Sequence, residues 1–286
     1  MPTSKLSNIH NNLDGYNQLV QLYEEHKDDI FEKIDIEMQV WFDANLSALL
    51  GGILDKIKND GLNDINFIYI KNDIQTILQK NGFLSFYGYP KVYDTNHTTI
   101  EYKKIKPSDT RYFNQYLEDE LLNRTEFPNM SEAVHDKISE SIQEMFINAT
   151  IHSETEFIYT CGQFFPRDHK LNFTIVDTGI GFAKRIKKDF DMEISSSDAI
   201  KWAMVEGHTT KQNVSGGLGL ALLKEFITLN KGKIQIISGD AFYELYDNSE
   251  KMQKLDGYYD GAVISMTFKT DDSKIYKFAS EIEDIF

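Results

Sequence analysis

The sequence predicts an α+β protein, in which a smaller α/β domain at residues 1–92 precedes an α/β sandwich at residues 93–286. Three observations carry this prediction. Strand and helix signals alternate through the first 90 or so residues, as in an α/β layer. Turn-forming and aromatic residues gather near residue 92, which is typical of a domain boundary. Beyond it, alternating strands and amphipathic helices favour helices packed on one face of a mostly antiparallel sheet.

The elements expected in the first half follow one another closely. Asp43 is expected to cap the helix that begins at residue 44. The expected helices are 16–31, 44–60 and 73–84, and the expected strands are 34–42 and 65–70.

In the second half a long helix is expected after Ser131, its predicted N-cap, and the helix that starts at Gly219 is expected to close at Lys231 and Gly232. The other expected helices are 110–123 and 195–207, and the expected strands are 98–105, 156–166, 170–177, 233–238 and 261–268.

Composition excludes several classes of protein. The formal net charge is −15, which argues against general binding to nucleic acid or to anionic membranes, because such binding relies on lysine and arginine. The first residues carry no apolar signal segment, and nowhere do about 18 apolar residues run together. We therefore expect a globular protein of the cytoplasm. Cys161 is the only cysteine, and we expect it to be a buried small hydrophobe.

The stretch "EMFINATIHS", residues 144–153, sets polar side chains beside an apolar helix face. Glu144 and Asn148 lie one turn apart and point away from the apolar arc. A polar pair at this spacing is usually a solvated helix face, so the stripe indicates a functional site only together with other motifs. His152 follows at the same spacing, and a helix-end role is the simpler interpretation.

Two glycine-rich segments supply that context. In "FTIVDTGIGF" a strand ends at Asp177, which offers an acceptor for an exocyclic amine, while Gly179 and Gly181 let a flat ligand approach. An ordinary glycine turn explains this segment alone equally well. In "TTKQNVSGGLGLALL", residues 209–223, glycines open a helix, and their backbone N–H groups form an anion site. Lys211 is placed to reach a terminal phosphate, and neither the P-loop nor the Rossmann pattern is present.

Together these three motifs resemble the N box and the two glycine boxes of the GHKL ATPase superfamily, over about residues 131–268. The resemblance implies a sandwich of the Bergerat type that binds ATP and Mg²⁺. It implies that Glu144 is the general base, that Asn148 binds Mg²⁺ and that Asp177 holds the adenine amine. Further ligand contacts are implied for Gly179, Gly181, Thr210, Lys211, Gly216, Gly217, Leu218 and Gly219.

The family pattern also implies an ATP lid between Phe182 and Ser215, most similar to the lids of anti-sigma-factor serine kinases and some histidine kinases. Ala262 stands where many members carry a threonine beside the adenine-binding aspartate, so adenine contacts are expected to rely more on water. The segment also contains no clear phosphoacceptor histidine box.

The stretch 34–84 resembles a STAS-type domain, which implies a regulatory or docking role for the first half. Asn45 stands where that family carries its phosphorylated serine, and Ser47 is a displaced candidate. An unrelated α/β cap is the alternative.

Three hypotheses follow. The first is a GHKL protein that hydrolyses ATP or transfers its γ-phosphate to a protein partner, with a serine kinase favoured. The second is a nucleotide-dependent switch with little turnover. The third is a structural protein whose motifs coincide by chance. The sequence leaves open whether the chain acts alone or as a homodimer.

Overall fold

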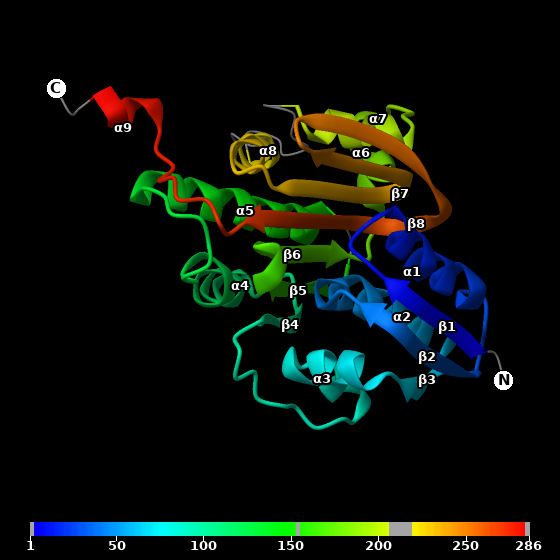
Figure 1. Cartoon of the computed structure of the whole chain (residues 1–286). Coiled ribbons are helices and arrows are strands. Elements are labelled where there is room, and N and C mark those ends of the chain that lie inside the picture. Colours follow the sequence, from blue (N-terminus) through cyan, green and yellow to red (C-terminus); the bar gives the residue numbers. More distant parts are fainter. Residues whose placement is uncertain (1–2, 153–154, 206–218, 284–286) are drawn as a thin grey trace.

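The computed structural model describes residues 3–152, 155–205 and 219–283, which form two β-sheets and the helices around them (Figure 1). The small sheet is parallel, with strand order β1-β2-β3. Its strands are β1 (Thr3–Ile9), β2 (Lys33–Phe42) and β3 (Asp64–Ile70). The helices of this half are α1 (Leu13–His26), α2 (Ser47–Gly61) and α3 (Asn72–Lys80).

The large sheet is antiparallel throughout, with strand order β4-β5-β6-β8-β7. Its strands are β4 (Thr99–Ile105), β5 (Ile158–Phe165), β6 (Lys170–Asp177), β7 (Lys233–Tyr246) and β8 (Ser249–Lys269). The helices of this half are α4 (Thr110–Leu117), α5 (Glu132–His152), α6 (Gly181–Phe190), α7 (Ser196–Ala203), α8 (Gly219–Leu229) and α9 (Ala279–Glu283). The mixed α+β class and the antiparallel second sheet are confirmed.

Both faces of the large sheet are covered. Ile175 faces a hydrophobic cluster that includes α4, α5 and α8, and its neighbour Val176 faces a second cluster that includes α1 and α2. Right-handed crossovers between successive parallel strands carry α1 and α2 to the same face of the small sheet. These two helices therefore lie between the two sheets (Figure 1).

The boundary predicted near residue 92 separates the two sheets, but one hydrophobic cluster crosses it. Ile53 and Leu54 of α2 share this cluster with Cys161 of β5 and with Tyr259 and Val263 of β8. Residues 3–92 contain three strands and three α-helices, with short 3-10 helices at Ala44–Leu46 and Phe83–Tyr87. The resemblance of this half to a STAS-type domain stays a prediction.

Several expectations about elements need correction. The sequence did not indicate β1, and β7 and β8 are much longer than the expected strands 233–238 and 261–268. Asp43 makes no side-chain capping hydrogen bond. Its carboxylate instead accepts from the Asn11 backbone N–H at 2.8 Å and from Trp41 Nε1 at 2.6 Å. Ser131 does act as expected, because its Oγ accepts from the Val134 N–H at 3.4 Å.

Across the described part of the chain, no helix has both the length and the apolar character needed to span a membrane.

Candidate functional site

Helix α5 carries the polar stripe beside a buried face, as the sequence predicted. Five apolar side chains on its inner face are 8% exposed or less, whereas Glu144 and Asn148 are only partly buried. The buried residues are Ile138, Ile142, Met145, Phe146 and Ala149. The stripe therefore lies at the margin of the core, where a side chain can meet both protein and ligand.

Glu144 contacts the start of α8, which is 75 residues further along the chain. The Gly219 N–H donates to Glu144 Oε2 at 2.9 Å. A Cβ on Gly219 would lie 2.6 Å from that oxygen and 3.1 Å from the Ser141 carbonyl oxygen, so a side chain here would displace the Glu144 carboxylate. The first N–H groups of a helix have no partner within the helix and favour an anion. The beginning of α8 thus binds a carboxylate in this structure.

Asp177 ends β6 and is only 7% exposed. Its carboxylate accepts hydrogen bonds from the backbone N–H groups of Gly179, at 3.0 Å, and of Ala262. Burial raises the pKa of this carboxyl to about 7, against the lowering effect of those two bonds and of the positive charge on Lys56. Ala262 is the residue that pairs with Asp177 across the sheet, as the family pattern implied.

Two glycines shape the turn after Asp177. Gly181 has φ 73°, and a Cβ there would lie 2.7 Å from Ser238 Oγ and 2.9 Å from the Gly261 carbonyl oxygen. Gly261 has φ 128°, and a Cβ there would collide with the carbonyl oxygen of Asp177. Both positions need glycine for conformation and for space.

The segment that leads into β5 is joined to the same turn. Thr155 Oγ1 lies 3.0 Å from Thr178 Oγ1 and accepts from the Thr178 N–H at 3.3 Å. The Tyr259 hydroxyl donates to the carbonyl oxygen of Asp177 at 3.0 Å. One end of the large sheet therefore brings together the segment that leads into β5, the turn after β6, and β8.

Sequence reasoning missed Thr155, Ser238, Tyr259 and Gly261 as parts of this site. Gly261 carried a signal, because a glycine at the start of an alternating strand often marks close backbone approach. The other three become visible only once the strands are paired.

Five expected ligand residues lie outside the described residues: Thr210, Lys211, Gly216, Gly217 and Leu218. The expected lid, 182–215, is partly corrected. Helices α6 and α7 occupy most of residues 181–203 and pack on β7, with Ile186, Ala199 and Ile200 buried. That part belongs to the body of the molecule and not to a separate lid.

The described residues fit a Mg²⁺-bound adenine nucleotide. Asp177 is a buried acceptor suited to an amine, and the Gly219 N–H donates to an anionic oxygen, that of Glu144. Asn148 offers a carbonyl oxygen, the ligand type that Mg²⁺ takes when phosphates complete its coordination. Among the residues that the structure describes, no group of three or more His, Cys, Asp or Glu side chains gathers as a metal cluster.

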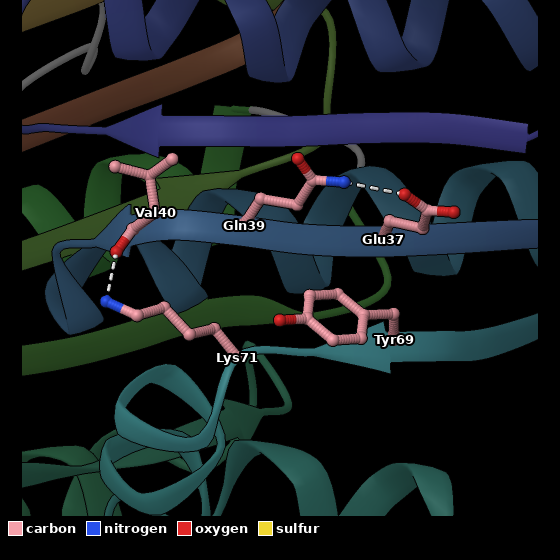
Figure 2. Close-up of a pocket in the computed structure, with 5 residues that line it drawn as sticks. All are labelled: Glu37, Gln39, Val40, Tyr69 and Lys71. Carbon is pink, nitrogen blue, oxygen red and sulfur yellow. Dashed lines mark hydrogen bonds between the residues drawn. The ribbon is translucent and has the colours of Figure 1, made fainter.

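A separate open groove lies on the outer face of the small sheet, with a volume of about 770 Å³ (Figure 2). Its lining residues are Glu37, Gln39, Val40, Tyr69 and Lys71. Lys71 Nζ donates to the Val40 carbonyl oxygen at 3.0 Å, and Gln39 Nε2 donates to Glu37 at 2.7 Å. The groove contains none of the predicted site residues.

Cys161 is fully buried, as expected. Burial raises the pKa of its thiol to about 12, so it stays protonated and unreactive.

No protein-family model matches this chain, and a search of curated proteins gives no significant match.

Proposed function

We propose that this chain is a Bergerat-type GHKL protein that binds ATP with Mg²⁺ and hydrolyses it or transfers its γ-phosphate to a protein, with a serine kinase favoured. One observation carries the proposal: the Glu144 carboxylate of the first motif contacts the Gly219 N–H of the third. Two motifs that lie 75 residues apart in the sequence are thus in contact in the folded chain. Chance placement of unrelated polar residues gives no reason for that contact.

The proposed roles follow from the chemistry of each group. Asp177 accepts a hydrogen bond from the adenine amine, and Asn148 gives an oxygen to Mg²⁺, which neutralises charge on the phosphates. Glu144 takes the proton from the attacking water or hydroxyl. The oxygen of that nucleophile bonds to the γ-phosphorus, and the bond between the γ-phosphorus and the oxygen that bridges to the β-phosphate breaks. Catalysis then consists of positioning, charge neutralisation and one general base.

A nucleotide-dependent switch with little turnover is the second candidate, and the same contact favours it. A carboxylate oxygen that already accepts a hydrogen bond from the Gly219 N–H, at 2.9 Å, is a weaker base toward the proton of an attacking water. In this version, ATP changes how α5 and α8 meet and thereby alters a surface that a partner binds.

The test uses γ-labelled ATP with wild type and with Glu144→Ala, each in the presence of cell extract. Free phosphate and labelled protein are followed separately. Label on a protein that depends on Glu144 supports the kinase, and free phosphate alone supports the ATPase. ATP binding without either product supports the switch, and no binding of ATP contradicts all three.

A further inference from the structure

Helix α2, from the first half of the chain, packs directly against the turn that follows Asp177. Gly52 is buried in α2, and a Cβ on it would lie 2.9 Å from Thr178 Cγ2 and 3.4 Å from Tyr159 Cδ2. One turn further along α2, Asp55 Oδ2 accepts from the Tyr159 hydroxyl at 2.9 Å. Residues far from the three motifs therefore form the wall behind the adenine end of the proposed site.

Thr178 has little freedom to move away from α2. Its side chain is β-branched and stiff at χ1. Its Oγ1 lies 3.0 Å from Thr155 Oγ1, and its N–H donates to that same oxygen. A group added at Gly52 must either break these bonds or shift the backbone of Thr178.

A shift of the Thr178 backbone would also move the neighbouring Asp177 carboxylate. Asp177 precedes it, and Gly179, whose N–H holds the Asp177 carboxylate at 3.0 Å, follows it. The Asp177 carbonyl oxygen is fixed by the Tyr259 hydroxyl on the other side. The contact between Gly52 and Thr178 thus sets where the carboxylate lies relative to the base it would bind.

We propose that α2 is a structural part of the nucleotide site and that Gly52 is a positioning residue for adenine recognition through Thr178. This inference rests on the proposed function. The first half then acts as a fixed wall of the site, so a displacement of α2 changes nucleotide affinity without any contact between α2 and the phosphates.

The experiment measures ATP·Mg²⁺ affinity by calorimetry in the full chain. Gly52→Ala is compared with Gly51→Ala, the preceding glycine of α2, whose added Cβ would meet the Tyr102 hydroxyl instead. Both changes give the helix the same gain in propensity and bring the new Cβ against another side chain. Thr178→Ser, which removes Cγ2 and keeps the hydroxyl, is made alone and together with Gly52→Ala.

We expect Gly52→Ala to weaken ATP binding by about tenfold, as small displacements of a positioned group do, and to raise KM more than it lowers kcat. Gly51→Ala should lower the melting temperature and leave affinity within about twofold of wild type. In the Thr178→Ser background, Gly52→Ala should change affinity by less than about twofold, because the contacting methyl group is gone. This last comparison remains decisive even if Gly52→Ala alone does not fold.

Equal effects of Gly51→Ala and Gly52→Ala on affinity, or an unchanged penalty in the Thr178→Ser background, would overturn the inference and leave the proposed function intact. Absence of ATP binding by wild type would overturn both.

Discussion

At the scale of single residues, Glu144 is the point at which α5 and α8 meet. Its carboxylate accepts a hydrogen bond from the Gly219 N–H, and a side chain added at Gly219 would displace that carboxylate. The same group would need to act as a base during turnover. Its two tasks can be separated by a substitution that keeps a hydrogen-bond acceptor and removes the basicity.

Glu144→Gln is expected to lower kcat by about 10²- to 10⁴-fold, the usual contribution of a general base, and to change ATP affinity little. The amide oxygen can still accept the Gly219 N–H, so the start of α8 keeps its partner. Steady-state phosphate release and calorimetry measure the two quantities.

Glu140→Gln is the matched control, because Glu140 lies one turn earlier on α5 and its exposed carboxylate forms a surface ion pair with Lys137. An equal loss of kcat in both variants would contradict the assigned role of Glu144.

Asp177 makes stability depend on pH. Its pKa rises from the ordinary 3.8 to about 7 on folding, because burial disfavours the charged form. The folded state therefore holds the proton more tightly. Protonation of Asp177 therefore adds to the free energy of unfolding. This contribution is fully present below about pH 3.8 and is lost as the pH rises through about 7.

Asp177→Asn removes this dependence. From pH 5 to pH 8, the unfolding free energy of wild type should fall by about 2 to 3 kcal/mol relative to that of the variant, because of the shift in the Asp177 pKa. Urea unfolding at the two values measures it. A constant difference between the two proteins would show that Asp177 titrates in its ordinary range.

At the scale of elements, a buried polar layer joins α2 and the preceding turn to the large sheet. Asn45 is fully buried, and its Nδ2 donates to Thr174 Oγ1 at 2.9 Å. Ser47 is equally buried, and its Oγ accepts from Asn81 Nδ2 at 3.1 Å. Neither position is open to a kinase in the folded chain, which corrects the expectation that Ser47 could replace the phosphorylated serine of STAS domains.

Ser47→Asp should therefore act as a buried unpaired charge and cost about 3 kcal/mol or more of unfolding free energy. The matched control is Ser108→Asp at an exposed site, where we expect a change within about 0.5 kcal/mol. A folded, unperturbed Ser47→Asp protein would show that this end of α2 opens to solvent.

The sequence predicted those elements whose own residues carry a clear period, such as α5 and β6. It did not predict β1, because "TSKLSNI" has few apolar residues and its stability comes from parallel pairing with β2. It shortened β8, because the outer arm of that strand is charged and exposed over much of its length. It ended β7 at Ser238, because Gly239 and Asp240 follow, where the pairing with β8 changes register. The tight turn between them, where Asp247 and Asn248 both have positive φ, was the available signal.

The motifs around Glu144 and Asp177 are local in sequence, so the sequence alone could name these two residues as candidates. The groups that hold those residues, such as Thr155 on Thr178 and Gly261 behind Asp177, depend on strand pairing and on loops that meet from distant segments. The role of α2 could not be predicted, because nothing in a helix pattern says which sheet face it will cover.

At the scale of the whole molecule, the two sheets share one hydrophobic cluster. Helices α1 and α2 bury apolar side chains against β5 and β8, and Tyr16 of α1 bonds to Asn11 and lies within 3.4 Å of Gln235 of β7. The small sheet and the C-terminal helix α9 lie on opposite sides of the molecule (Figure 1). Loss of either half would expose the face that the other covers.

We therefore expect the full chain to unfold in a single transition, with equal calorimetric and van't Hoff enthalpies. Residues 93–286 alone should not unfold cooperatively, because their sheet would expose the apolar face that α1 and α2 bury. Two resolved transitions in the full chain would show that the shared cluster does not couple the halves.

The central claim is that this chain binds ATP with Mg²⁺, and calorimetry on the full-length protein tests it most directly. We expect ATP to bind at one site per chain when Mg²⁺ is present, with affinity reduced about tenfold or more in Asp177→Asn. The amide oxygen of the variant is needed to accept the Gly179 N–H, so an amide nitrogen, which cannot accept the adenine amine, replaces the other carboxylate oxygen. Absence of binding at high micromolar concentration, or equal binding by wild type and Asp177→Asn, would contradict the claim.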